Sequence, residues 1–199
     1  MMRPMKRLMV TATIAAVIAA FAPHTDAAPP KKKYHFELTK VLAKPEVKPD
    51  VAKTAQPKVE AQIKKKFEDH PQLVATLDGA PDPAANADAY RKFLIKKGIA
   101  GSYLVTVEIT DASEELVPME GKPTSQRLVI HVGLHLLGET IPGRTMGFTG
   151  DGQATVKQEV GLKMRDKDRD YTWDGAVETA IDDALKTCFE QLSKTPTKQ

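Results

Sequence analysis

Two histidines separated by three residues are the first candidates for chemistry. The sequence HVGLH places His131 and His135 four positions apart, a spacing that would bring two zinc ligands to one face of a helix. The surrounding residues Val129, Ile130 and Val132 instead favour a strand. Four residues of strand extend over about 13 Å, whereas zinc–nitrogen bonds are about 2.0–2.1 Å long. We therefore predict that the two histidines share no metal ion and lie on a solvated or half-covered strand face.

A glycine-rich segment, TMGFTGDGQATV at positions 145–156, raises the question of phosphate binding. Phosphate loops aim backbone N–H groups at the anion from the start of a helix. Here the following residues alternate between polar and apolar, and the Gly-Lys-Ser or Gly-Lys-Thr ending is missing. Gly150, Gly152 and Ala154 are in phase with the apolar positions, which predicts one long strand with a helix lying close against it. A turn at Asp151-Gly152 is the alternative.

Nucleophilic and acid–base chemistry have no clear signature in the sequence. None of the serines lies in a Gly-x-Ser-x-Gly motif. Cys188, the single cysteine, falls on the apolar stripe of a predicted helix and is interpreted as a buried small hydrophobe; pairing between chains is the alternative. The adjacent acids Glu114-Glu115 and Asp182-Asp183 do not converge on one substrate and are interpreted as surface charge. We predict no catalytic residue, no metal site and no cofactor.

A polar connection predicted at 111–125 is the segment best suited to binding another molecule. It contains the apolar residues Leu116, Val117 and Met119, and long loops between strands are often functional. These three residues are therefore the candidate partner-binding residues. The alternative is that they fold back over the core as a lid.

The elements that position these residues follow from hydrophobic periodicity. Alternation predicts a strand at 34–41 and three further strands in the second half of the chain, and the short apolar run at 72–77 predicts a fifth. Helical spacing predicts three helices, and charged residues 165–170 are interpreted as a solvated turn. The predicted class is α/β (α+β), a single mixed sheet of about five strands with three helices in the order β-α-β-α-β-β-β-α. The predicted ranges are strands 34–41, 72–77, 103–109, 126–137 and 145–160, and helices 57–70, 83–97 (with Asn86 as an alternative start) and 172–192.

The N-terminus has the pattern of a secretory signal peptide. Arg3, Lys6 and Arg7 precede an apolar run of about fifteen residues, which is shorter than the roughly 20 residues of a membrane-spanning helix. We predict cleavage before Ala28; a retained anchor helix is the alternative. The expected organisation is a signal peptide at 1–27, a disordered start at 28–33, one domain at 34–193 with a Pro/Lys-rich extended connector at 44–56, and a disordered tail at 194–199.

Charge excludes one large class of partner. The chain has 29 Lys and Arg and 26 Asp and Glu, and residues 1–27 hold three of the former and one of the latter, which leaves 26 against 25. Nucleic-acid-binding proteins show a basic domain or stripe, and the mature chain has only the short lysine runs 31–33 and 64–66. We expect no nucleic-acid partner and, after signal removal, no integral membrane segment. No cysteine near the cleavage site offers a position for lipid attachment.

The order of the elements is similar to that of a known group of envelope proteins. The strands YLVTVEI, RLVIHVGLHLL and TMGFTGDGQATV, followed by the helix WDGAVETAIDDALKTCFEQL, resemble the envelope α/β domain of the TolB N-terminal part, the curli secretion protein CsgG and the outer-membrane activators of penicillin-binding proteins. The resemblance implies a non-catalytic domain that works by protein contact in the bacterial envelope. It transfers no site residue.

The expected function is that of an exported, periplasmic or secreted adaptor or accessory protein that binds an envelope protein. Its contact surface would be an exposed strand edge or the 116–119 segment. An exported protein that binds a small ligand, and an enzyme with a dispersed site, are the alternatives. An apolar pocket with convergent polar groups would favour the ligand-binding class.

Overall fold

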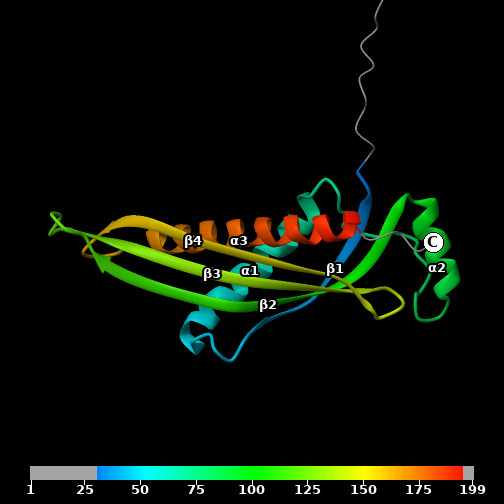
Figure 1. The fold of residues 1–199 in the computed structure, drawn as a ribbon, viewed down its shortest axis with the longest axis horizontal. Coiled ribbons are helices and arrows are strands. Elements are labelled where there is room, and N and C mark those ends of the chain that lie inside the picture. Colours follow the sequence, from blue (N-terminus) through cyan, green and yellow to red (C-terminus); the bar gives the residue numbers. More distant parts are fainter. Residues whose placement is uncertain (1–30, 195–199) are drawn as a thin grey trace, which may run out of the picture. The chain divides into compact units, whose positions relative to one another are not determined.

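A computed structural model describes residues 31–194 as a mixed α/β fold with three helices and one four-stranded open sheet (Figure 1). The class is as predicted, with four strands instead of five. The predicted signal peptide and residues 195–199 lie outside the described residues. The elements are β1 (Lys33–Ala43), α1 (Pro49–Asp69), α2 (Ala87–Lys96), β2 (Ile99–Pro118), β3 (Ser125–Thr140), β4 (Met146–Gly161) and α3 (Asp166–Lys194).

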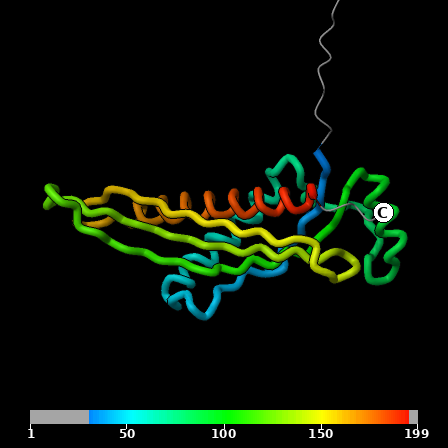
Figure 2. The backbone as a smooth tube through the Cα atoms, in the orientation of Figure 1, coloured from blue at the N-terminus to red at the C-terminus, as the bar shows by residue number. Residues whose placement is uncertain are grey.

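The sheet has the strand order β1-β2-β3-β4. Strand β1 pairs with β2 in parallel, whereas β2, β3 and β4 form an antiparallel meander of long strands. The two hairpin turns of the meander therefore lie at opposite ends of the strands (Figure 2). We call the end with the turn 119–124 the distal end and the end with the turn 141–145 the proximal end.

One face of the sheet carries the core and the other is open. Alternate residues of β2, β3 and β4 are buried under α1 and α3, which both cross that face (Figure 1). The period of two places apolar residues such as Ile109, Ile130 and Leu134 on the helix side. Two ion pairs join the helices, Lys58 to Asp174 at 2.8 Å and Lys66 to Asp182 at 2.7 Å. The opposite face holds the polar residues of each strand.

The glycine-rich segment forms the long strand that the sequence predicts, and α3 lies close against it. A Cβ atom at Gly152 would be 2.0 Å from the carbonyl oxygen of Ala180, and one at Gly150 would be 2.2 Å from Sγ of Cys188. Both glycines are therefore required by the approach of the helix. The alternative of a turn at Asp151-Gly152 is wrong, because both residues pair with β3 in regular register.

Two predictions in the first half of the chain are wrong. Residues 72–77 form no strand, since only Leu73 makes an isolated bridge to Tyr34, and Val74 and Leu77 pack instead in a small second core. The segment 44–56 is not an extended connector throughout, because α1 begins at Pro49 and continues through Pro57. Burial of Ala55, Val59, Ile63 and Phe67 against the sheet offsets the hydrogen bond that a proline removes from a helix.

Three boundaries also differ from the sequence prediction. The strand β2 extends to Pro118, so the loop predicted at 111–125 shrinks to a short hairpin turn. The charged run 165–170 is not a turn, because α3 begins at Asp166 with acidic residues in its first turn, where they favour the helix dipole. At the N-terminus of the domain, β1 already begins at Lys33, within the segment predicted to be disordered, and Lys194 still belongs to α3.

Candidate functional site

The three candidate partner-binding residues lie at the distal end of the sheet. Leu116 and Val117 are the last apolar residues of β2, paired with Leu128 and Arg127 of β3, and Met119 begins the turn. Because adjacent residues of a strand point to opposite faces, Leu116 lies on the helix side and Val117 on the open side. The three residues therefore do not form the continuous loop patch that the sequence suggested.

The distal end nevertheless exposes much apolar surface. Leu116 and Val117 are 45% and 42% exposed, and Leu162, directly after β4, is 63% exposed. The side-chain amide of Gln126 donates to the carbonyl oxygens of Gly161 and Leu162, which fixes this corner to β3. Met119 is half-buried.

A partly buried polar contact holds the distal part of β2 against α3. Nε of Arg169 lies 2.7 and 2.9 Å from the two carboxylate oxygens of Glu114, and Nε1 of Trp173 donates to the same carboxylate at 2.8 Å. The interpretation of Glu114 as surface charge is thus wrong, while its neighbour Glu115 is exposed. This contact positions the strand segment that presents Leu116 and Val117.

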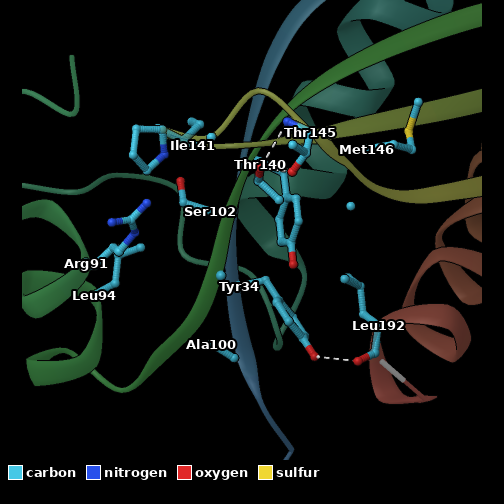
Figure 3. Close-up of a pocket in the computed structure, with 15 residues that line it drawn as sticks. Tyr34, Arg91, Leu94, Ala100, Ser102, Thr140, Ile141, Thr145, Met146 and Leu192 are labelled. Atoms are coloured by element: carbon cyan, nitrogen blue, oxygen red, sulfur yellow. Dashed lines mark hydrogen bonds between the residues drawn. The ribbon is translucent and has the colours of Figure 1, made fainter. Parts of the chain in front are cut away.

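A pocket of about 590 Å³ lies at the proximal end, between the starts of β1, β2 and β4, the turn 141–145, α2 and the end of α3 (Figure 3). Tyr34, Tyr103, Ser102 and Arg91 supply polar groups, and Leu94, Ile141 and Leu192 are among the apolar residues of its wall. The hydroxyl of Tyr34 points toward the carbonyl oxygen of Leu192 at 3.4 Å. Sequence reasoning missed this pocket, because its walls come from five segments that no short motif connects.

The pocket walls are held in place by hydrogen bonds. The hydroxyl of Tyr90 donates to Oγ of Ser102 at 2.8 Å, the backbone N–H of Ile141 donates to the carbonyl oxygen of Ser102 at 2.9 Å, and Thr140 and Thr145 bond across the turn. Burial raises the pKa of both Tyr34 and Tyr103 above the ordinary tyrosine value. Their phenols are therefore neutral at physiological pH and offer hydrogen bonds rather than charge.

The two histidines lie on the open face, each with its own partners. Nδ1 of His135 is 2.6 Å from Oδ1 of Asp151, while His131 contacts Oγ1 of Thr155 at 2.9 Å and Oδ2 of Asp111 at 3.3 Å. Within residues 31–194 no group of three or more His, Cys, Asp or Glu side chains is placed to hold a metal ion. Each histidine thus has its own set of neighbouring side chains on the strand.

Cys188 is buried and unpaired, as expected for a small core residue. Desolvation raises the pKa of its thiol to about 12. Because the thiolate is the reactive form, this side chain has the opposite of the environment that activates a nucleophilic cysteine. Because Cys188 is fully buried, its sulfur is not accessible to a cysteine of a second chain.

Comparison with known proteins gives similarity at the level of structure alone. No protein-family model and no curated protein matches the chain. A protein of the DUF330 family from Xanthomonas campestris is 11% identical over 85% of this chain and 93% of its own, with a TM-score of 0.45. A minor lipoprotein from Acinetobacter baumannii is 12% identical over 82% of this chain and 93% of its own, with a TM-score of 0.41.

These similarities are too distant for any transfer of function. The structures named above are a DUF330 protein and a lipoprotein, and neither is TolB, CsgG or an activator of penicillin-binding proteins. The group of proteins named from the sequence is corrected accordingly. What remains is a partial similarity in structure to bacterial proteins such as these two. Among the described helices, none has the length and hydropathy needed to cross a membrane.

Proposed function

We propose that the protein is an exported, non-catalytic component of the bacterial cell envelope that acts by binding another protein through the distal end of its sheet. The single observation that supports this proposal best is the exposure of Leu116, Val117 and Leu162 at the distal end of the sheet. Exposed apolar side chains gathered at one place are typical of interaction sites. The export and envelope location rest on the signal-peptide pattern.

The distal corner combines apolar side chains with a rigid support. Glu114 fixes β2 to α3 only two residues before Leu116, and Gln126 fixes the end of β4 to the start of β3. A partner would therefore meet a preformed surface and would lose little conformational freedom in ordering it. The contact would be made by side chains on both faces of the β2–β3 hairpin, because Leu116 and Val117 point in opposite directions.

Substitution of the two distal residues should abolish partner recovery. In intact cells, a C-terminally tagged protein crosslinked to its neighbours should yield one recurrent envelope protein. The double substitution Leu116→Ser and Val117→Ser should reduce its recovery by about tenfold or more, since central apolar contacts often contribute 2 kcal/mol or more to binding. The readout is the amount of that partner per tagged chain by quantitative mass spectrometry.

Ile95→Ser is the matched control for this experiment. Ile95 is 66% exposed on α2, at the other end of the sheet, so that its substitution removes a comparable apolar surface without affecting the distal corner. Equal loss of the partner with Ile95→Ser, or unchanged recovery with the distal double variant, would show that the distal corner is not the contact surface.

The proximal pocket favours a second candidate function, the binding of a small amphipathic ligand. Its apolar walls, neutral phenols and one guanidinium fit an apolar body with an acidic or hydrogen-bond-accepting head group. Arg91 contacts Asp88 at 3.0 Å, and both side chains are exposed, so the guanidinium is free to turn toward a ligand in the pocket.

Native mass spectrometry of the purified protein would test the ligand-binding candidate. A bound small molecule should be seen on the wild type, and Arg91→Ala should reduce the bound fraction by about tenfold, the effect of losing one hydrogen bond to a charged group. Lys92→Ala is the control, because Lys92 neighbours Arg91 but does not line the pocket. An unliganded wild type after gentle purification, or equal loss in both variants, would contradict the proposal.

A further inference from the structure

The outer edge of β4 is protected along its first half. In an antiparallel strand the N–H and C=O groups of alternate residues point away from the paired neighbour. On β4 three such groups bond to side chains of α3: the N–H of Thr149 to Gln191 at 2.9 Å, the carbonyl oxygen of Asp151 to Thr187 at 3.2 Å, and the N–H of Gln153 to Asp183 at 3.3 Å. This capping prevents another strand from pairing there.

The second half of the same edge has no such protection. The alternation continues without a register shift to Gly161, so the backbone groups of Thr155, Lys157 and Glu159 also point outward. Within residues 31–194 no hydrogen-bond partner is found for these backbone groups. Within the strand segment 155–161 the edge is therefore unpaired at Thr155, Lys157 and Glu159, and side chains are exposed at every second position.

The facing residues of α3 change at the same place. The capping residues Asp183, Thr187 and Gln191 are four positions apart. The same spacing, continued toward the start of α3, reaches Thr179, Gly175 and Tyr171. The Thr179 hydroxyl bonds to its own helix at Gly175, a Cβ at Gly175 would meet nothing within 4 Å, and Tyr171 is 73% exposed. Along this row the helix thus supplies no cap to the edge beyond Gln153, and the Tyr171 ring is exposed.

The side chains of this edge are complementary to themselves in one register. Two copies of 155–161 can pair antiparallel about a two-fold axis at Gln158, which keeps the outward-pointing residues opposite one another. Lys157 then faces Glu159 of the second copy on the open side, twice by symmetry, and Val156 faces Val160 on the helix side. Axes at Lys157 or at Glu159 instead place like charges opposite each other, which is destabilising.

We infer that the protein forms a two-fold symmetric dimer in which the β4 edges at 155–161 of two copies pair antiparallel, with Lys157 opposite Glu159, and join the two sheets into one. Two-fold dimers are the commonest oligomers of soluble proteins. Glu159 contacts Lys122 at 2.7 Å within its own chain, and Lys157 has no ion pair in the described structure, so the carboxylate would accept from two cations in the dimer. The inference does not depend on the proposed partner at the distal corner.

Sedimentation velocity of the purified protein over a range of concentrations tests this interface. The wild type should sediment as a dimer, and Lys157→Glu should raise its dissociation constant by about tenfold or more, because two pairs of like charges would face each other. Adding Glu159→Lys to that variant should recover dimerisation. Lys65→Glu on α1 is the control for the change in net charge. A monomeric wild type, or a dimer unaffected by Lys157→Glu, would overturn the inference.

A disulfide measures the register directly. Gln158→Cys places two thiols opposite each other at the two-fold axis, in a non-hydrogen-bonded pair whose Cα atoms are about 4.5 Å apart, so mild oxidation should yield a covalent dimer. Gln153→Cys, on the capped half of the edge, should form no covalent dimer under the same conditions. Native Cys188 is buried and should not contribute. Absence of the covalent dimer with Gln158→Cys would exclude this register even if the protein dimerises elsewhere.

Discussion

Gly152→Ala is expected to destabilise the protein strongly. The added Cβ would lie 2.0 Å from the carbonyl oxygen of Ala180 and 2.5 Å from the backbone nitrogen of Ala184. These are backbone atoms in the middle of α3, so no rotation of a side chain relieves the contact and the helix itself must move. Overpacking of a core typically costs about 1–3 kcal/mol, and we expect a loss of about 3 kcal/mol in the free energy of unfolding.

Urea denaturation followed by Trp173 fluorescence measures this loss. Trp173 is fully buried in α3 and is the only tryptophan of the chain, so its emission reports the packing of the helix on the sheet. The midpoint should fall with little change in the slope of the transition. An effect below about 0.5 kcal/mol, the usual scatter of surface substitutions, would mean that α3 does not approach β4 as closely as described.

Gly175→Ala is the matched control, and it should act in the opposite direction. Gly175 lies within the same helix, and a Cβ there would have no heavy atom within 4 Å. Alanine is favoured over glycine in a helix interior by about 1 kcal/mol. The same chemical change should therefore stabilise at one position and destabilise at the other, which separates steric packing from general effects of glycine replacement.

The close packing at Gly152 was predictable from sequence because two signals coincided there. The glycines fall in phase with the apolar residues of an alternating segment, and a strongly apolar helix follows directly. Apolar spacing together with cap residues also indicated α2. There Asn86 accepts the hydrogen bond of the N-terminal cap, and Gly98 adopts the positive φ that ends the helix.

The errors arose where tertiary contacts outweigh local preference. Pro45, Pro49 and Pro57 indicated an extended connector, yet the buried residues of α1 stabilise a helix that passes through Pro57. The apolar run at 72–77 looked like a strand, but its side chains pack against Tyr90, Leu94 and Ile99 in the small second core. Neither a local propensity nor a period of two distinguishes these outcomes, because they depend on which surface is available after folding.

At the candidate site, too, contacts between distant parts of the chain could not be predicted from the local sequence. The sequence predicts Leu116 and Val117 as apolar residues of a binding loop; both are exposed, but they lie on β2. Four polar or charged residues, Asp111, Ser113, Glu114 and Glu115, indicated a solvated loop. Arg169 and Trp173, more than fifty positions away in the sequence, instead hold Glu114 on a strand that is bound to α3. The pocket depends on five separated segments of the chain, and for the same reason it could not be predicted.

Glu114→Ala should therefore loosen the distal end of the sheet. The substitution leaves Nε1 of the buried Trp173 without its acceptor and removes the partner of Arg169, so we expect a loss of about 2–3 kcal/mol, the cost of breaking hydrogen bonds to a charged group and leaving a buried donor unpaired. Hydrogen exchange should accelerate in the distal half of β2 more than in its proximal half, because the contact ties that part of the strand to α3.

Glu115→Ala provides the comparison, since Glu115 is the next residue on the same strand and is exposed without a described side-chain contact. Its substitution should change the free energy of unfolding by less than about 0.5 kcal/mol. If the distal corner binds a partner as a preformed surface, Glu114→Ala should also weaken that contact although it leaves Leu116 and Val117 in place, whereas Glu115→Ala should not. Equal partner recovery from both variants, despite faster exchange in the first, would mean that binding does not require the rigidity that Glu114 supplies.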